Sequence, residues 1–153
     1  MIYALLYTFI GFIAMEFSGW FIHKYIMHGI LWKIHKTHHT HTKGFFELND
    51  LFSLLFACIA IVLIFLGIDG WDYRFWLGLG ITIYGMSYFF LHDVLIHRWL
   101  KLFSKPKNGY LAGIFSAHQA HHISKDKDGA VSFGLFIVPG KFFKNKRRWV
   151  GIQ

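Results

Sequence analysis

The chain contains a single cysteine, Cys58, among its 153 residues, and 8 acidic residues against 16 lysines and arginines. One thiol cannot form an internal disulfide. The lack of further thiols also excludes zinc fingers and cysteine-bound iron–sulfur clusters. Cys58 lies within an apolar run, and we expect it to pack as a small hydrophobic side chain.

The shortage of acidic residues leaves a formal net charge of +8. In a soluble protein this charge would suggest nucleic-acid binding. Here the basic residues flank apolar runs, so we expect them to contact the headgroups of anionic membrane lipids, and we expect no nucleic-acid partner. We also expect no cleavable signal peptide, because residues 1–17 lack a positively charged leading segment.

Long apolar runs are abundant, since 55% of the residues are hydrophobic and 20% are aromatic. Three runs have the length needed to cross a bilayer, namely Ile2–Ile22, Leu51–Ile68 and Phe75–Leu91. We expect the helix of the third run to continue through Leu100, and the short segment 67–74 to form a hairpin turn. The sequence therefore predicts an all-α, multi-pass helical membrane protein with one domain.

The lysines and arginines predict how the chain lies in the membrane. Residues 23–50 carry four of them and residues 98–153 carry eleven, whereas the hairpin tip carries only Arg74. We therefore expect the N-terminus and the hairpin tip to face outward and the other segments to face the cytoplasm. Residues 110–115 or 131–138 could form a fourth embedded segment, although both are too short to cross alone.

Ten of the eleven histidines fall into a pattern that occurs twice, in which an H-x4-H pair precedes an H-x2-H-H triplet. They are His23, His28, His35, His38, His39, His92, His97, His118, His121 and His122. Imidazole is the commonest metal ligand in proteins, and one ion does not need ten. The pattern predicts two metals with about five nitrogen ligands each, and imidazole suits zinc, copper, iron and nickel alike. His41 fits neither copy; we expect it to be a solvated loop residue, with an additional ligand or a residue that supports the site as the alternative.

Helix geometry predicts which of these histidines can bind the same metal ion. Positions i, i+3 and i+4 lie on one face of an α-helix, so each triplet should converge. Positions i and i+5 lie about 140° apart, so each pair should straddle a site or reach different metals rather than chelate one ion. Both pairs lie where a span leaves the membrane, which predicts one histidine-rich dimetal site facing the cytoplasm.

Four polar residues near the histidines are candidates for supporting the site. Glu16 lies within a span and could orient a histidine or contact a substrate, or it could bind another span. Asp93 precedes His97 by four residues, at the spacing where a carboxylate can hold an imidazole N–H. Asn49 and Asp50 could cap the helix that they begin or could support the metals.

The motifs HKYIMHGILWKIHKTHH, GFFELNDLF, LHDVLIHRW and AHQAHH followed by SFG resemble the bacterial non-haem β-carotene hydroxylase family. This family belongs to the fatty acid hydroxylase/sterol desaturase superfamily, and the resemblance covers residues 16–133. The histidine spacings are common to the whole superfamily. The motifs HKYIMHG, FELNDL and HDVLIHRW are specific to a much narrower set of proteins. All ten motif histidines are present, so the resemblance implies an active enzyme.

The resemblance implies a di-iron centre, with Fe²⁺ and Fe³⁺ states, bound by those ten histidines. It implies hydroxylation of carotenoid β-ionone rings at C3 and C3′, from β-carotene through β-cryptoxanthin to zeaxanthin. It also implies O₂ as co-substrate, a ferredoxin-type electron donor, a carotenoid drawn from the bilayer and a bacterial inner-membrane location. The alternatives are a related hydroxylase, ketolase or desaturase of a sterol or fatty acyl lipid, and a non-catalytic zinc-binding membrane protein.

Overall fold

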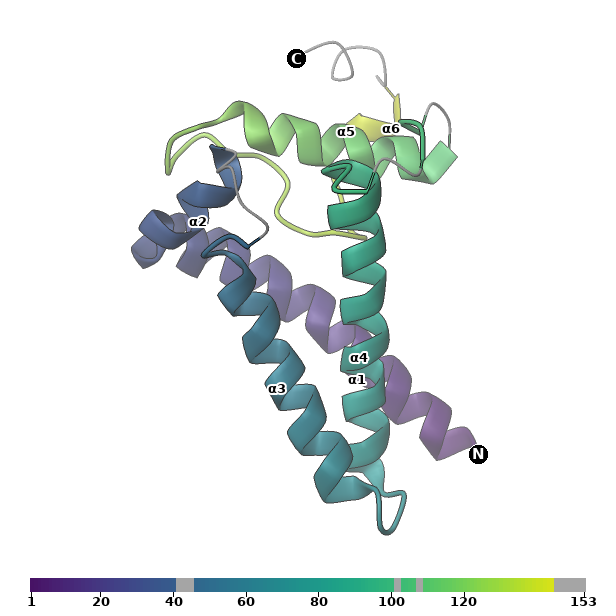
Figure 1. Ribbon diagram of the computed structural model, residues 1–153. Coiled ribbons are helices and arrows are strands. Elements are labelled where there is room, and N and C mark those ends of the chain that lie inside the picture. Colours follow the sequence, from purple (N-terminus) through teal and green to yellow (C-terminus); the bar gives the residue numbers. More distant parts are fainter. Residues whose placement is uncertain (41–45, 101–102, 107–108, 145–153) are drawn as a thin grey trace.

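The structure is a computed structural model that describes residues 1–40, 46–100, 103–106 and 109–144 (Figure 1). Within these ranges the chain is helical or irregular and contains no strand, which confirms the all-α prediction. His41 lies outside the described residues.

Among the described residues, three helices are long and apolar enough to cross a membrane. The first consists of α1 (Ile2–Phe21) and η1 (Ile22–Ile30), the second is α3 (Asp50–Gly67), and the third consists of α4 (Tyr73–Tyr88) and η2 (Phe89–Ile96). The three predicted spans are thus confirmed. The predicted continuation of the third helix through Leu100 is wrong, because the helix ends at Ile96 and Arg98 has a φ of 56°, a left-handed conformation that a right-handed helix does not contain.

The α1 and α3 helices each pack along α4 (Figure 1). Glycines allow α1 and α4 to approach closely, because a Cβ on Gly80 would overlap the carbonyl oxygen of Thr8 and a Cβ on Gly11 would overlap that of Leu77. Such small residues are typical of helix contacts inside membranes, where no hydrophobic effect drives the helices together. The predicted hairpin between α3 and α4 is present, and the Asp72 side chain caps α4 by accepting a hydrogen bond from the Arg74 amide.

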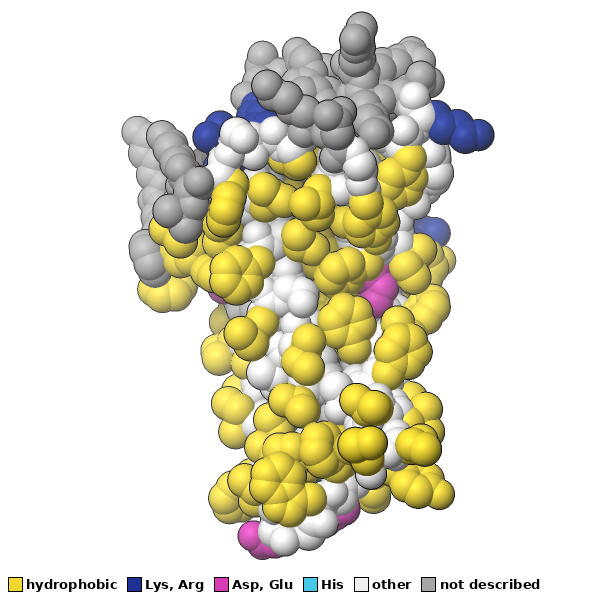
Figure 2. Space-filling model, turned by 90° about the vertical axis from the view of Figure 1, so that its right-hand side faces the viewer, with side chains coloured by type: hydrophobic (Ala, Val, Ile, Leu, Met, Phe, Trp, Pro, Cys, Tyr) yellow, Lys and Arg dark blue, Asp and Glu magenta, His cyan; other side chains and the backbone are white. Residues whose placement is uncertain are grey.

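Apolar side chains cover the outer surface of the three spans, as Figure 2 shows for one face. Large side chains such as Phe9, Leu54 and Phe65 are more than half exposed, which is expected of a surface that meets lipid rather than water. Cys58 is also exposed on α3, among the apolar side chains of this surface. The lysines and arginines visible in Figure 2 lie toward the end that carries α5.

A helical cap covers one end of the spans. It contains α2 (Trp32–His39), α5 (Gly109–Ile123), which lies across the span ends, and the short α6 (Lys141–Lys144) (Figure 1). The N-terminus and the α3–α4 turn lie at the opposite end. Residues 110–115 belong to α5, whose apolar side chains pack in the cap, and residues 131–138 are irregular. Neither segment belongs to the candidate spans of the described residues, in line with the expectation that both are too short to cross alone.

Candidate metal centre

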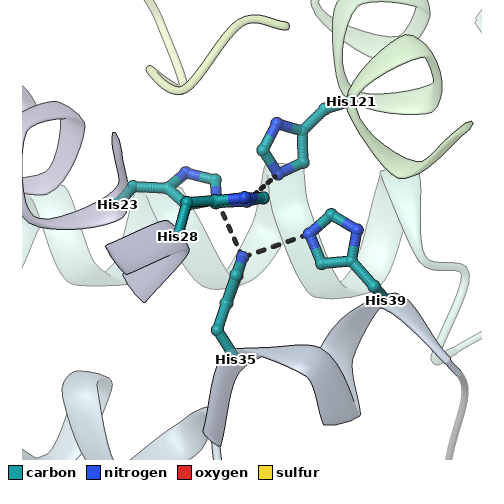
Figure 3. A group of neighbouring side chains, drawn as sticks. All are labelled: His23, His28, His35, His39 and His121. Carbon is teal, nitrogen blue, oxygen red and sulfur yellow. Dashed lines mark hydrogen bonds between the residues drawn. The ribbon is translucent and has the colours of Figure 1, made fainter. Parts of the chain in front are cut away.

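Within the part of the chain that the structure describes, nine histidines form two groups at the capped end of the spans. The first group comprises His23, His28, His35, His39 and His121 (Figure 3). The second group comprises His38, His92, His97 and His118. Within each group the ligand nitrogens lie within 4.8 Å of one another. Each group can therefore hold one metal ion, and residues from η1, α2, η2 and α5 meet there.

Each H-x4-H pair contributes both of its histidines to the same group. The expectation that a pair straddles a site or reaches different metals, rather than chelating one ion, is therefore wrong. His23 and His28 lie in the π-helical segment η1, and His92 begins the corresponding turn in η2 that ends at His97. The Leu31 amide bonds to the Ile26 carbonyl and the His97 amide to the His92 carbonyl, both in the i to i−5 pattern. This wider turn brings positions i and i+5 onto one face, whereas the prediction assumed an α-helix.

The triplets, by contrast, divide between the groups, so the expectation that each converges on one site is also wrong. His35 and His39 lie one α-helical turn apart on α2 and join the first group, while His38 joins the second. Adjacent helical positions differ by about 100° in direction. The His38 and His39 side chains therefore point to different groups, and α2 bridges the two.

His122 extends the same arrangement to α5. It is not one of the nine grouped histidines, but its ring centroid lies 4.5 Å from that of His118 and 4.9 Å from that of His97 in the second group, and 4.5 Å from that of His39 in the first. Its Nε2 atom is buried without a hydrogen-bond partner. His118 and His122 lie one turn apart on the side of the second group, while His121 reaches the first. With His122 as a fifth member of the second group, each group would draw on one pair and on both triplets.

The outer nitrogens of the first group are held by backbone acceptors. The Nδ1 atoms of His23, His28 and His39 donate to the carbonyl oxygens of Phe133, Lys127 and Ser124 at 2.9, 3.0 and 2.9 Å. A carbonyl can only accept, so the proton of each neutral ring lies on Nδ1 and a lone pair remains on Nε2. The loop that follows α5 thus fixes the orientation of three rings.

The inner nitrogens then face one another in a way that fits a cation. His35 Nε2 lies 3.0 Å from His23 Nε2 and 3.2 Å from His39 Nε2 (Figure 3). These are hydrogen-bonding distances, but His23 and His39 have no proton on Nε2 to donate, and one His35 proton could not satisfy both. Lone pairs that converge on one point are the donor set of a metal site. His121 Nε2, which lies 3.2 Å from His28 Nε2, is a further inner nitrogen of this group (Figure 3).

Burial keeps these rings neutral. It lowers the pKa of His39 to about 4, partly offset by the hydrogen bond to Ser124, and it lowers the pKa values of His38, His118 and His121 well below the ordinary value of 6.5. The other histidines nearby lower the last three pKa values further, because a second positive charge would be repelled. Neutral imidazole is the form that binds a metal.

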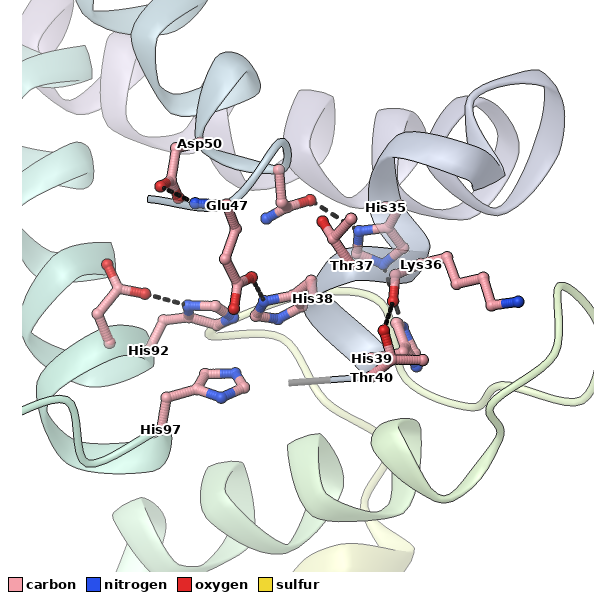
Figure 4. A network of polar contacts seen from close by, with 12 residues as sticks. His35, Lys36, Thr37, His38, His39, Thr40, Glu47, Asp50, His92 and His97 are labelled. Carbon is pink, nitrogen blue, oxygen red and sulfur yellow. Dashed lines mark hydrogen bonds and ion pairs between the residues drawn. The ribbon is translucent and has the colours of Figure 1, made fainter. Parts of the chain in front are cut away.

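Carboxylates hold the second group. The Nδ1 of His38 lies 3.2 Å from an oxygen of Glu47, and the Nδ1 of His92 lies 2.6 Å from an oxygen of Asp93 (Figure 4). Asp93 thus contacts its neighbour His92, rather than His97 as its i, i+4 spacing predicted. Sequence reasoning missed Glu47, which lies in the motif FFELND but has no periodic relation to any histidine.

The remaining polar candidates have different partners. The Asn49 side chain accepts a hydrogen bond from His35 Nδ1 at 2.8 Å and makes no capping bond at the start of α3. Asp50 accepts from the Glu47 amide, so it orders the turn that carries Glu47. Glu16 accepts from the Tyr84 hydroxyl and from the amides of Phe136 and Ile137. Glu16 therefore joins α1 to α4 and to the loop that contains Phe133.

An apolar cavity of about 500 Å³ lies directly beside both groups. Its walls come from α1, α3 and α4, and its end is lined by His23 and His35 of the first group and His38 and His92 of the second. The site therefore combines two metal-binding groups with a chamber suited to an apolar molecule.

Comparison with known proteins agrees with this chemistry. The family described as fatty acid hydroxylase matches residues 8–144. A β-carotene hydroxylase of Pseudescherichia vulneris is 46% identical over 82% of this chain and 72% of its own length. The β-carotene hydroxylases of Pantoea ananas and Paracoccus sp. (strain PC1) are 44% and 38% identical over 88% and 83% of this chain, and over 77% and 79% of their own lengths. No solved structure matches.

Proposed function

Because the chain belongs to the fatty acid hydroxylase family, we propose that it is a membrane iron enzyme that hydroxylates the β-ionone rings of carotenoids. The reaction adds hydroxyl groups at C3 and C3′, converting β-carotene through β-cryptoxanthin to zeaxanthin. The observation that carries this proposal is the identity of 46% with a β-carotene hydroxylase over 82% of the chain. The apolar cavity that ends at the histidines supports it, because the substrate is an apolar ring.

Two iron ions form the metal centre in this proposal. One is bound by His23, His28, His35, His39 and His121, and the other by His38, His92, His97, His118 and His122. The two histidine groups and the unpartnered Nε2 of His122 support this assignment. The backbone and carboxylate acceptors on the Nδ1 atoms orient the rings toward the ions, as acceptors outside a metal site commonly do.

The reaction needs four reactants to balance. A ring C–H bond, O₂, two electrons and two protons give a C–OH group and one water. The bound iron supplies the redox chemistry that no side chain can provide. The electrons come from a ferredoxin-type donor that reaches the capped end of the spans. The cavity walls hold the ring and keep bulk water away from it, because apolar side chains from three helices form them.

The capped end faces the cytoplasm of a bacterium, and the N-terminus and hairpin tip face outward across the inner membrane. The bias of lysine and arginine toward residues 23–50 and 98–153 supports this orientation. The three spans and the exposed apolar side chains support insertion as a multi-pass protein that meets membrane lipids directly.

Pigment analysis tests the function. A β-carotene-accumulating bacterium that expresses the chain should produce zeaxanthin, and the His38→Ala variant should produce none. Lys36→Ala is the matched control, because Lys36 is exposed on the same helix and should leave the product unchanged. Unchanged β-carotene beside an inserted, iron-loaded wild-type protein with an adequate electron donor would refute the carotenoid assignment and point to another lipid.

A further inference from the structure

Three helices wall the cavity beside the histidines, but only two of the three helix pairs pack against each other. Both α1 and α3 pack along α4, whereas α1 and α3 have little contact with each other. In Figure 1, α1 crosses behind α4, whereas α3 runs beside α4 to the hairpin turn. The cavity is lined by Met15 and Trp20 from α1 and by Ala60 from α3. It therefore occupies the space that α1 and α3 leave between them.

The residues of α3 that line the cavity differ in solvent exposure, and this difference indicates on which side the cavity is open. Ser53, Ala57 and Ile61 line it and are exposed, and they form one row at i, i+4 and i+8. Phe52, Phe56 and Ala60 form the neighbouring row, and Ala60 is only 4% exposed. On the opposite wall Trp20 is 37% exposed. Tyr84 of α4 is buried at the back of the cavity, whereas Gly85 and Phe89 of α4 are exposed, so the cavity opens along α3 within the apolar belt of the molecule, next to the gap between α1 and α3.

We propose that this opening along α3 is a lateral mouth through which one ring of a carotenoid enters from the bilayer, and that Ala57 and Gly85 keep the chamber behind it open. The proposal rests on the proposed function. It commits to one occupant, the ring end of a carotenoid, because the chamber is apolar, meets both histidine groups and opens toward lipid rather than water.

The dimensions fit a ring end rather than the whole molecule. The cavity follows α3 from Asn49 to Ile61, roughly 18 Å at 1.5 Å per residue. Its volume of about 500 Å³ lies within the usual range for a site that encloses a small ligand. β-Carotene has two rings joined by a long polyene chain, so the remainder of the chain and the second ring stay in the membrane.

Two small residues make the chamber testable without disturbing the fold. A Cβ added to Gly85 meets nothing within 4 Å, although Gly85 lines the cavity from α4. Ala57 lines it from α3 and is exposed. Larger side chains at these positions would fill the chamber rather than clash with backbone. Neither residue contacts a histidine in any hydrogen bond or ring pair of the described structure.

The experiment compares Ala57→Phe and Gly85→Leu with the neighbouring substitutions Cys58→Phe and Met86→Leu. Cys58 and Met86 are exposed and do not line the cavity. Each protein is purified with its iron, and the β-carotene that it retains without reductant is measured beside iron content, melting temperature and zeaxanthin yield in cells. The cavity variants should keep their iron and melting temperature but lose retained β-carotene and zeaxanthin by roughly tenfold or more, because a filled site excludes the ring.

The two controls should match the wild type in every measurement. Full β-carotene retention and zeaxanthin yield in both cavity variants would overturn the proposal, as would an equal loss in Cys58→Phe. A wild-type protein that converts β-carotene while the cavity variants convert it equally well would refute only the chamber. A loaded wild-type protein that neither retains nor converts β-carotene would refute the proposed function, and the chamber with it.

Discussion

The ring centroids of His23 and His28 lie 5.3 Å apart, although the two residues are five positions apart in the sequence. The π-helical turn of η1 makes this possible, because its hydrogen bonds run from i to i−5. The same turn recurs in η2 around His92 and His97, whose centroids are 4.6 Å apart. On an α-helix the H-x4-H spacing would direct the two histidines away from each other. On the π-helical turn the same spacing lets both bind one metal ion.

His35 occupies the middle of the first group, with its Nε2 atom close to those of both His23 and His39. We expect His35→Ala to remove about half of the bound iron and to abolish zeaxanthin formation. The substitution removes a ligand of the first iron only, because the five proposed ligands of the second iron are unchanged. Iron per chain, measured by mass spectrometry of purified protein, checks this. Lys33→Ala on the exposed side of α2 should retain the wild-type iron content, and equal iron in the two variants would contradict the assignment.

Asn49 should act on the metal through His35 rather than on the helix that it precedes. Asn49→Ala removes the acceptor of the His35 Nδ1 proton and is expected to weaken metal affinity by about 10- to 100-fold. Asn49→Asp keeps an acceptor and should retain most of the affinity. Competition with a chelator measures both values. A drop in melting temperature of the metal-free Asn49→Ala protein, without a change in affinity, would instead indicate a capping role.

Glu16 joins three parts of the protein through one carboxylate. In Glu16→Ala the Tyr84 hydroxyl and the amides of Phe136 and Ile137 lose their acceptor, at a cost of about 1–3 kcal/mol for each group left buried. We expect a clearly lower melting temperature in detergent and faster proteolysis of residues 131–138. Glu16→Gln retains an acceptor oxygen and should recover most of the loss. A wild-type proteolysis rate in Glu16→Ala would show that the loop does not depend on this contact.

The contact between α1 and α4 depends on Gly80. A Cβ at this position overlaps the Thr8 carbonyl, so Gly80→Ala should force the helices apart and destabilise the protein by about 1–3 kcal/mol. Gly85→Ala, on the same helix but with open space at its Cβ, should cause no such loss. Melting temperatures of the two purified variants make the comparison, and equal values would contradict a tight helix contact at Gly80.

The metal-free protein should lose stability in mild acid. The pKa of His39 is lowered from 6.5 to about 4 in the folded state, so below pH 6.5 the unfolded chain takes up a proton that the folded chain does not. Stability should therefore fall as the pH decreases from about 6.5 to 4. His38, His118 and His121, whose pKa values are also lowered, should add to the fall. Melting curves of chelator-treated protein across this range test the direction, which stability rising toward pH 4 would contradict.

The sequence was sufficient to predict the three spans, the hairpin and the gathering of histidines at one end, because apolar run length and charge bias are local signals. It was insufficient to predict how the histidines divide. His23 and His28 depend on a π-helical turn that resembles any other apolar helix end in sequence. His38 and His39 are separated by direction on α2, which matters only once α5 and η2 are in place.

The supporting contacts were harder to predict for a related reason. Glu47 contacts His38, which lies nine positions before it in the sequence. Three of the Nδ1 acceptors are backbone carbonyls, and the side chains of the residues that carry them give no information about the hydrogen bond. Asp93 was recognised as important, but its partner depended on the backbone geometry of η2. Glu16 was identified because a carboxylate within a span is rare. Its contacts with Phe136 and Ile137 join segments 120 residues apart and had no local signal.

A chamber that admits one ring at a time has a consequence for the order of the products. The two ends of a symmetrical substrate cannot react in a single encounter, so the half-finished molecule must leave, turn around in the bilayer and return by its other end. There it competes with fresh β-carotene. The proportion of β-cryptoxanthin should therefore rise when the membrane is rich in starting pigment and fall as that pigment is exhausted, which makes the composition of the membrane, rather than the enzyme alone, a determinant of the final mixture of products.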